Sequence, residues 1–436
     1  MKEFIPSGEQ GGSLFHFFLI RYRLSAMVGN FLEHYDNALF GLLAPFIAPL
    51  FFKGTDPVTA LVLTYCILPL GLITRPFGSI FFGWIGDRIG RKYALFYSLS
   101  GTALVTMSMG LLPTYQEIGS HAPLFLAFGK MLQSFFVAGE SSGGAIFILE
   151  HTPQKKRSFV SSCYDASSIG GILFASALIT LFSTLGWLDQ YWRLLFFAGG
   201  VTALFGLLLR WKTEDGPEFL HEKKTLPERI WPLLKEQKRT LLAIILVSGF
   251  SYTLYSLAFT LMTGYIPLIT SATRTEIAKT NTLLLIIDFL LLPCFGYLAS
   301  KFGKRRIMIA AAITSALTAI PLFSLLDQAQ AGVIIAVRII IVLCGVAFSA
   351  PYHAWALEQL PPRHRYRILS LGNALGSQLI GMPASAICLW LYQLLGWSWS
   401  PGLYLLITGS AASLALVSFS KSKVLQKTGT ALIIEK

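Results

Sequence analysis

The stretch GWIGDRIGRK, from Gly83 to Lys92, lies between two long apolar segments and has a looser copy, GYLASKFGKRR, from Gly296 to Arg306. The two copies begin 213 residues apart in a chain of 436 residues. A second pair agrees, because ILEHTPQKKR at Ile148–Arg157 returns 208 residues later as ALEQLPPRHR at Ala356–Arg365. The chain is therefore interpreted as a duplication whose unit is about half its length.

Apolar residues dominate this unit, since 54% of the chain is hydrophobic and only 13% is charged, and its mean hydropathy is +0.62. In soluble proteins about a quarter of the residues are charged. A helix of about 20 apolar residues crosses the roughly 30 Å of hydrocarbon in a bilayer. Such runs lie at about 24–50, 59–84, 93–112, 123–150, 158–184, 190–211, 240–268, 280–300, 306–326, 332–358, 367–395 and 401–420. The predicted fold is an all-α membrane protein with twelve transmembrane helices in two six-helix halves.

The positive charge of the chain, formally +13, is unevenly placed. Most of the 35 Lys and Arg lie near the termini and in the loops after every second apolar run, whereas only Lys53, Arg274 and Lys279 lie in the opposite loops. Cytoplasmic loops of membrane proteins are enriched in Lys and Arg. We therefore expect both termini in the cytoplasm, and we interpret the charge as a topology signal and not as a nucleic-acid surface.

The same pattern predicts the organisation of the chain. The long polar interval 212–239 falls between the two halves and is read as a cytoplasmic linker. The expected parts are a cytoplasmic N-terminal segment 1–23, a first half 24–211, the linker 212–239, a second half 240–420 and a cytoplasmic tail 421–436. The apolar stretch Leu14–Ile20 is too short for a cleaved signal and ends in Arg21, so the first membrane helix is expected to be retained.

No sequence pattern indicates an enzyme. There is no nucleotide-binding loop and no nucleophile with a placed base. The five cysteines lie in apolar runs without paired or metal-ligand spacing. We expect no cofactor and no metal, and we interpret the cysteines as small packing residues.

The first copy of the repeated phrase has the chemistry of a conformational latch. Glycines permit close backbone approach, and charged side chains in a turn can form charge-assisted hydrogen bonds to a neighbouring helix end. The predicted gate residues of this loop are Gly83, Asp87, Arg88, Gly90 and Arg91. The phrase resembles the signature loop of the major facilitator superfamily. The second copy has Ser300 where the first has Asp87, so the stronger latch is expected in the first half, the alternative being charges that only fix topology.

Three further stretches carry a narrower resemblance. They are NFLEHYDNALFGLLAP (Asn30–Pro45), TRPFGSIFFGWIGDRIGRK (Thr74–Lys92) and KMLQSFFVAGESSGGA (Lys130–Ala145). These stretches are similar to the bacterial metabolite:proton symporter family, which includes transporters of proline/betaine, citrate, 2-oxoglutarate and shikimate. The chain departs from that family at His34, Asn37, Lys130, Ser134 and Ser141, so the resemblance does not fix the substrate.

Ionisable residues at membrane depth are costly and usually face a cavity or a partner. At about 1.5 Å per residue, Asp36 and Lys130 are expected at similar depth. Glu33 lies three residues before Asp36 on the expected same face, and Gln133 one turn after Lys130. The hypothesis is that Glu33 or Asp36 carries a coupling proton. Two acids on one face raise the pKa of one of them, and a nearby lysine lowers the pKa of the other. The alternative is a permanent ion pair between the first and fourth helices.

Further candidates extend this site. His34 is a weaker proton-coupling candidate because it points about 100° away from Glu33. The repeat maps Lys130 onto Arg338 and Arg75 onto Asp288. The predicted substrate-binding residues are Arg75, Lys130, Gln133, Asp288 and Arg338. Arg75 suits a substrate carboxylate because a guanidinium binds carboxylates bidentately, the alternative being a structural contact.

Other acids are expected at the inner gate. Glu140 and Asp165 lie nearer the cytoplasmic ends of their segments and are predicted gate or relay residues, unless they are satisfied locally. Glu150 and Glu358 recur just before basic loops and are expected to brace the gate by pairing with Arg or Lys. His353 is expected to be a hydrogen-bonded packing residue.

These observations predict a secondary active transporter that couples a small polar metabolite or osmolyte, zwitterion or organic acid, to protons by alternating access. The expected partners are the substrate, the proton and the lipid bilayer, with the chain a monomer in a bacterial inner membrane. One alternative is an exchanger or uncoupled facilitator for nucleosides or amino acids. Another is a transporter-like sensor that binds without net flux.

Overall fold

The computed structural model describes residues 9–89, 91–138, 143–150, 152–211, 234–360 and 365–418. Secondary structure in these ranges is helical throughout, as predicted. The helices of the first half are α1 (Glu9–Phe51), α2 (Pro57–Cys66), α3 (Gly71–Arg88), α4 (Arg91–Gly110), α5 (Tyr115–Ile118), α6 (Ala122–Val137), α7 (Gly143–Glu150), α8 (Arg157–Thr184) and α9 (Leu188–Trp211).

The helices of the second half are α12 (Lys238–Tyr255), α13 (Met262–Ile269), α14 (Arg274–Phe302), α15 (Lys304–Ser324), α16 (Ala331–Ser349), α17 (Tyr352–Glu358), α18 (Arg365–Gly376), α19 (Ala384–Leu395) and α20 (Pro401–Ser418). The described ranges contain the expected twelve rods when the short α5 is left aside. Five of these rods are interrupted and consist of two helices each, namely α2–α3, α6–α7, α12–α13, α16–α17 and α18–α19. Eight helical segments in these ranges are long and apolar enough to cross a membrane.

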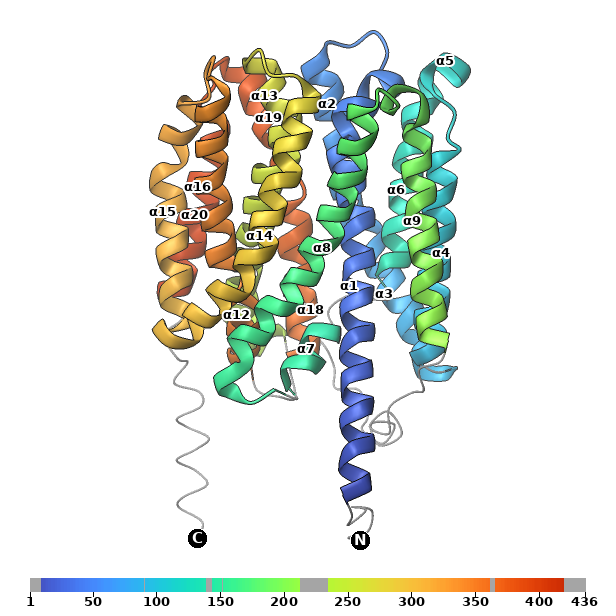
Figure 1. Cartoon of the computed structure of the whole chain (residues 1–436), viewed down its shortest axis with the longest axis vertical. Coiled ribbons are helices and arrows are strands. Elements are labelled where there is room, and N and C mark those ends of the chain that lie inside the picture. The colour runs from blue at the N-terminus through green and yellow to red at the C-terminus, as the bar shows by residue number, and fades with distance from the viewer. Residues whose placement is uncertain are drawn as a thin grey trace.

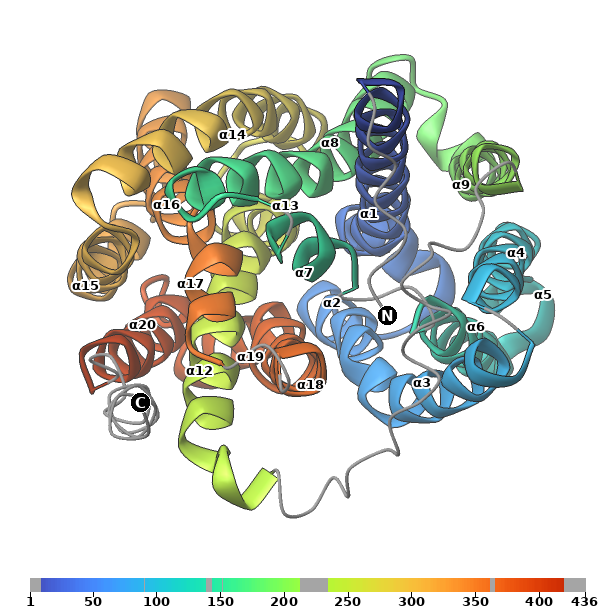
Figure 2. The same ribbon diagram turned by 90° about the horizontal axis from the view of Figure 1, so that it is seen from below.

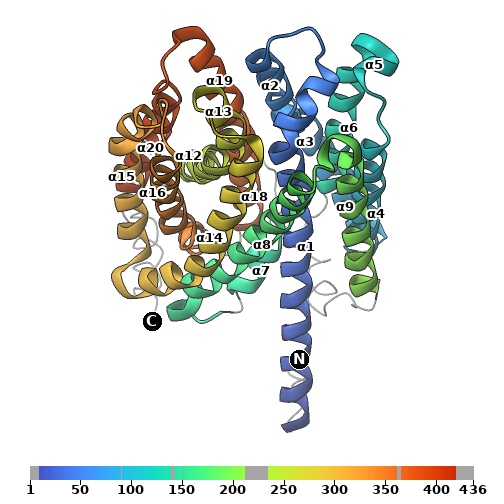
Figure 3. The ribbon, with the colours of Figure 1, turned by 45° about the horizontal axis from the view of Figure 1, so that its top comes forward.

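The rods stand roughly parallel, with the two halves side by side (Figure 1). We call the end at which α1 begins and α20 ends the terminal face. The end view shows α8 against α14 and beside α1 (Figure 2). Helix α1 starts at Glu9, earlier than the boundary expected at residue 24, and projects beyond its neighbours at the terminal face (Figure 3). The predicted linker 212–239 lies outside the described residues up to residue 233.

Two rods of the second half contain a π-helical turn, at Ser256–Leu261 and at Ser377–Gly381. In the second turn the N–H of Met382 donates to the carbonyl oxygen of Ser377 at 2.7 Å. Pro383 follows directly, and a proline ring would clash with the carbonyl four residues earlier in a regular helix. The widened turn accommodates this clash, which explains why the rod of α18 and α19 is interrupted here.

Side-chain caps fix the helix starts at the face opposite the terminal face. Asp56 accepts hydrogen bonds from the backbone N–H groups of Val58 (3.1 Å) and Thr59 (3.0 Å) at the start of α2. The hydrogen bonding of Thr59 to this carboxyl lowers the pKa of Asp56 below its ordinary value. Thr273 and Glu276 form a capping box on α14. These caps satisfy backbone donors that a helix leaves open.

Large apolar side chains cover the outside of the bundle. Phe77, Ile80, Leu104 and Leu317 are exposed there, whereas ionisable side chains such as Lys130 and Arg338 are buried. An apolar exterior around a polar interior is the arrangement that a lipid environment requires. The exposed residues therefore mark the lipid-facing surface.

Glycines let the helices approach closely. A Cβ on Gly171 of α8 would lie 2.1 Å from the carbonyl oxygen of Phe31 in α1, and one on Gly78 of α3 would lie 2.1 Å from the carbonyl oxygen of Phe135 in α6. Between the halves, a Cβ on Gly296 of α14 would lie 2.0 Å from the Ser162 hydroxyl oxygen of α8. Small residues at such contacts are typical of membrane helices.

Replacing Gly171 by alanine should destabilise the protein, because the new methyl group would collide with backbone atoms that cannot rotate away. We expect a loss of about 1–3 kcal/mol, the usual cost of overpacking, seen as a lower unfolding temperature of the purified protein. Gly332→Ala is the control, since a Cβ there has nothing within 4 Å. Equal unfolding temperatures for Gly171→Ala and wild type would contradict the close packing of α1 and α8.

Candidate functional site

A cavity of about 210 Å³ lies between the two halves. Helices α1, α3, α7 and α8 line it from the first half, and α12, α17, α18 and the two π-helical turns line it from the second. Its charged lining residues among those described are Glu33, Arg75 and Asp165, and His34 and His353 also face it. The cavity thus holds both signs of charge and contacts both halves.

Glu33 and Arg75 form an ion pair across the first half. The Arg75 Nη2 lies 3.6 Å from the Glu33 Oε1, and both side chains are largely buried. This distance exceeds that of a hydrogen bond. The Arg75 Nε has no hydrogen-bond partner in the described part of the chain. The guanidinium therefore has donor capacity left for another acceptor.

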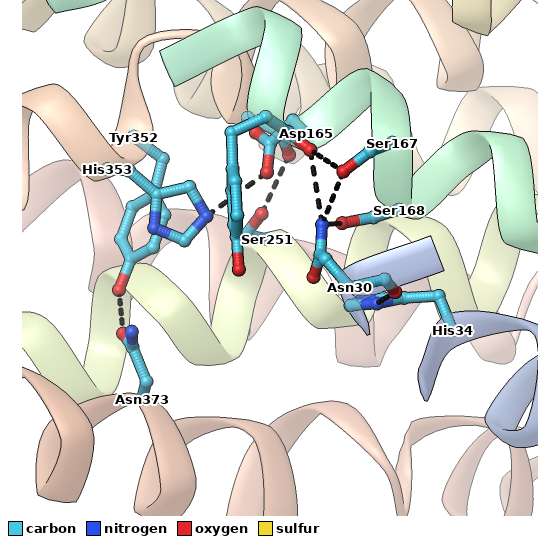
Figure 4. A network of polar contacts seen from close by, with 11 residues as sticks. Asn30, His34, Asp165, Ser167, Ser168, Ser251, Tyr352, His353 and Asn373 are labelled. Carbon is cyan, nitrogen blue, oxygen red and sulfur yellow. Dashed lines mark hydrogen bonds and ion pairs between the residues drawn. The ribbon is translucent and has the colours of Figure 1, made fainter. Parts of the chain in front are cut away.

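A second pair joins the halves. The His353 Nε2 of α17 lies 3.1 Å from the Asp165 Oδ1 of α8 (Figure 4). The His353 ring meets Tyr164 edge-on at 5.5 Å and Tyr352 at 5.0 Å between ring centroids. The Tyr352 hydroxyl donates to the Asn373 side chain. His353 was expected to be a packing residue, but it faces the cavity.

Asn30 fixes α1 against α8 beside this pair. Its amide donates to the carbonyl oxygen of Tyr164 (3.1 Å) and to the hydroxyls of Ser167 (2.9 Å) and Ser168 (2.6 Å) (Figure 4). The His34 Nδ1 lies 2.8 Å from the Asn30 carbonyl oxygen. His34 is thus held by its own helix, although it lines the cavity.

A separate polar chain crosses the core of the first half. The Lys130 Nζ donates to the Gln133 Oε1 (2.7 Å), the Gln133 Nε2 to the Thr106 hydroxyl (2.8 Å), and this hydroxyl to the Asp36 Oδ2 (3.3 Å). Asp36, Lys130 and Gln133 are buried and do not line the cavity. The expected cluster is therefore only partly formed.

Glu33 departs from this cluster and pairs with Arg75 in the cavity. Residues three apart on a helix differ by about 60° in direction. This angle is enough to turn Glu33 toward the cavity while Asp36 points into the helix bundle. The prediction that the two carboxylates share a site is corrected accordingly.

The second half holds a corresponding pair of buried charges outside the cavity. Arg338 of α16 donates to the Asn281 side chain, and its Nη2 donates to the Ala258 carbonyl oxygen (3.2 Å) in the first π-helical turn. The Tyr255 hydroxyl, which lines the cavity, donates to the Asp288 Oδ1 at 3.4 Å. Neither Arg338 nor Asp288 lines the cavity, and Tyr255 connects Asp288 to it.

The acids before the basic loops pair with basic residues, as expected. The Glu150 Oε1 lies 3.1 Å from the Arg365 Nη1 in the other half, and the Glu358 Oε1 lies 2.5 Å from the Lys304 Nζ in the same half. These pairs lie at the terminal face. Glu140, Gly90 and the side chains of Asp87, Arg88 and Arg91 lie outside the described part of the structure, and the backbone of Gly83 belongs to α3.

The duplication reappears in hydrogen bonds. The Arg157 Nε donates to the carbonyl oxygens of Leu149 and Thr152, and the Arg365 Nε donates to those of Leu357 and Leu360. All four bonds measure 3.1 Å, and each partner is shifted by 208 residues. The two halves thus share, at the terminal face, an arginine that donates to two backbone carbonyl oxygens.

Sequence reasoning missed several lining residues. Asn30 stood in a quoted stretch without a role, and Asn373 lies 208 residues after Asp165. The repeat that mapped Lys130 onto Arg338 would also have paired Asp165 with Asn373. The lining tyrosines Tyr164, Tyr252, Tyr255 and Tyr352 carry no sequence signal, because aromatic residues also occur at lipid-facing and interfacial positions.

Twelve helical rods around a polar cavity between duplicated halves are the architecture of a membrane transporter. The family described as "Sugar (and other) transporter" matches residues 23–229, and the "Major Facilitator Superfamily" matches residues 242–432. The chain belongs to the major facilitator superfamily.

Relatives support this assignment. The chain is 28% identical over 406 residues to a glycine betaine/proline/ectoine/pipecolic acid transporter of Dickeya dadantii, covering 88% of this chain and 79% of the relative. It is 27% identical over 405 residues to a proline/betaine transporter of Escherichia coli, covering 88% and 80%. The resemblance to a family that includes proline/betaine transporters is thus confirmed.

Solved structures share the fold. The xylose transporter of Escherichia coli in a partially occluded inward open conformation has a TM-score of 0.72 and 17% identity, covering 93% of this chain and 100% of that one. A D-xylose-proton symporter has a TM-score of 0.71 and 18% identity, covering 93% and 98%. The predicted fold class is confirmed.

Glu150→Gln should loosen the terminal face, because the Arg365 side chain loses its ion pair with the other half. An exposed ion pair contributes about 0.2–1 kcal/mol, so a cysteine placed at Ala145 in a background without the five native cysteines should label up to about fivefold faster. Glu358→Gln is the matched comparison, since its pair with Lys304 stays within one half and its loss should raise the labelling rate less. Identical labelling rates for Glu150→Gln and its parent would contradict a bracing role.

Proposed function

We propose that the protein is a proton-coupled symporter of a small zwitterionic or carboxylate osmolyte or metabolite. The observation that carries this proposal is the Glu33–Arg75 pair inside a cavity lined by both halves. The names of the Dickeya dadantii and Escherichia coli relatives agree with such a substrate. The charge distribution supports a cytoplasmic location of the terminal face in a bacterial inner membrane, and the proposed unit is a monomer.

Arg75 is the proposed site for a substrate carboxylate. Its planar guanidinium can bind a carboxylate through two parallel hydrogen bonds, and its Nε is unoccupied among the described residues. Glu33 competes for the same guanidinium. A substrate carboxylate that takes Arg75 leaves Glu33 without its counterion, and a carboxylate without a counterion at this depth takes up a proton.

This exchange links substrate to proton through one residue. Protonation of Glu33 frees Arg75 for the substrate, and departure of the substrate returns Arg75 to Glu33, which favours proton release. Asp36 is the second candidate for the proton, through its chain to Lys130. We favour Glu33 because it faces the cavity, and we assign Asp36, Lys130 and Gln133 to the packing of α1, α4 and α6.

Arg338 and Asp288 are proposed to support the site from behind. Arg338 holds the carbonyl of the first π-helical turn, and Asp288 orients the Tyr255 hydroxyl. The proposed gate comprises the Glu150–Arg365 and Asp165–His353 pairs at the terminal side of the cavity. Glu358, together with the Gly83–Arg91 loop, steadies the same face.

Glu33→Gln should abolish accumulation driven by a proton gradient, because the neutral amide cannot take up a proton and provides no negative partner for Arg75. Exchange of internal for external substrate should persist. Proteoliposomes loaded with a pH dye and given labelled proline or glycine betaine measure both activities, and Asp36→Asn is run in parallel. Proton-driven uptake that survives in both variants refutes the coupling proposal. Wild-type exchange without gradient-driven accumulation indicates a facilitator, and binding without flux indicates a sensor.

Arg75→Lys should weaken substrate binding, because an ammonium cannot form the two parallel bonds of a guanidinium. A hydrogen bond to a charged group contributes about 1.5–3 kcal/mol, so KM for uptake should rise about 10- to 150-fold. Arg193→Lys is the control, since Arg193 bonds the Leu112 carbonyl oxygen and does not line the cavity. An unchanged KM in Arg75→Lys would refute the carboxylate site.

A further inference from the structure

We propose that Asp165, together with Tyr164 and Tyr352, forms a subsite for the positively charged end of the substrate. This inference rests on the proposed function and makes it narrower, because it selects zwitterions over organic acids. It also gives the bound molecule a direction, with its carboxylate at Arg75 and its ammonium group at Asp165. The subsite is built by α8 of one half and α17 of the other.

The charges of the cavity point to a cationic ligand. The charged lining residues in the described ranges are two carboxylates and one guanidinium. Glu33 is matched by Arg75, so Asp165 is the carboxylate without a guanidinium partner. Its partner His353 is charged only when it is protonated, so a substrate ammonium would give Asp165 a permanent positive partner.

Asp165 has an oxygen available for this role. Its Oδ1 faces the His353 Nε2, whereas its Oδ2 is buried and has no hydrogen-bond partner in the described ranges. A buried acceptor without a donor is rare in proteins and calls for an explanation. A cationic group at Oδ2 would supply the missing interaction without breaking the contact to His353.

Aromatic rings complete the subsite. Tyr164 and Tyr352 flank His353, and Tyr252 and Tyr255 also line the cavity. The faces of such rings attract cations, and quaternary ammonium groups are commonly held by aromatic side chains. Tyr252 lines the same cavity as Glu33, Arg75 and Asp165.

The wall of the subsite is held in place before a ligand arrives. Asn30 bonds the Tyr164 backbone, and Asn373 accepts from the Tyr352 hydroxyl. A site held in its binding geometry loses less entropy on binding. Asn373 is the repeat counterpart of Asp165, and its neutral amide gives the other wall no charge. The negative charge of Asp165 on one wall therefore has no negative counterpart at Asn373 on the other wall.

The experiment compares glycine betaine with 3,3-dimethylbutanoate, which has the same shape but a carbon in place of the ammonium nitrogen. Calorimetric titration of the purified full chain should show at least tenfold tighter binding of glycine betaine. Asp165→Asn should reduce this preference to about twofold or less while binding of 3,3-dimethylbutanoate persists, which also shows that the variant is folded. Asp327→Asn, which removes an exposed acid at the opposite face, should keep the wild-type preference.

A second comparison separates a local subsite from the overall charge of the cavity. The double variant Asp165→Asn/Asn373→Asp keeps the number of carboxylates but moves one to the other wall, and its preference should stay lost. Recovery of the preference in the double variant overturns the subsite, as does equal affinity of both ligands for the wild type. Failure of the wild type to bind either ligand overturns the proposed function as well.

Discussion

The structure depends on the absence of water from the bilayer core. Every backbone N–H and C=O group in that region must find its partner within the protein, which restricts the spanning segments to helices. Charged side chains meet the same restriction and are confined to the interior. Asp36, Lys130 and Arg338 satisfy it with hydrogen bonds inside one half, whereas Glu33, Arg75 and Asp165 satisfy it in the cavity. The separation of these two sets distinguishes packing from function.

This restriction explains how much the sequence could predict. Long apolar runs and the placement of Lys and Arg sufficed for twelve rods and two halves, because both signals reflect the bilayer itself. The depth of Asp36 and Lys130 was also predictable from helical rise. The rotation of α1 was not, since a difference of about 60° decides whether Glu33 faces the cavity or the bundle. The close approach at Gly171 and the hydrogen bonds of Asn30 hold α1 against α8 in the observed rotation.

The site was less predictable for a related reason. His353 and Asp165 are 188 residues apart and meet only because the two halves close on each other. No periodicity within one helix reports such a contact. The repeat gives partial information, because Arg157 and Arg365 keep the same carbonyl partners, but the positions that face the cavity have diverged. Asp165 against Asn373 is one such pair, and the assigned roles of the site residues stay predictions.

Alternating access requires that the contacts closing the two ends of the cavity be individually weak. At the terminal face these are the Glu150–Arg365 and Asp165–His353 pairs. Toward the opposite face, the Tyr65 hydroxyl donates to the Thr260 carbonyl oxygen (2.9 Å) and Gln393 donates to the Thr59 hydroxyl (2.8 Å). Hydrogen bonds and partly exposed ion pairs of this kind contribute about 1 kcal/mol each. Such small differences can be reversed by the binding of a ligand, whereas α8 and α14 are in close contact at Gly296.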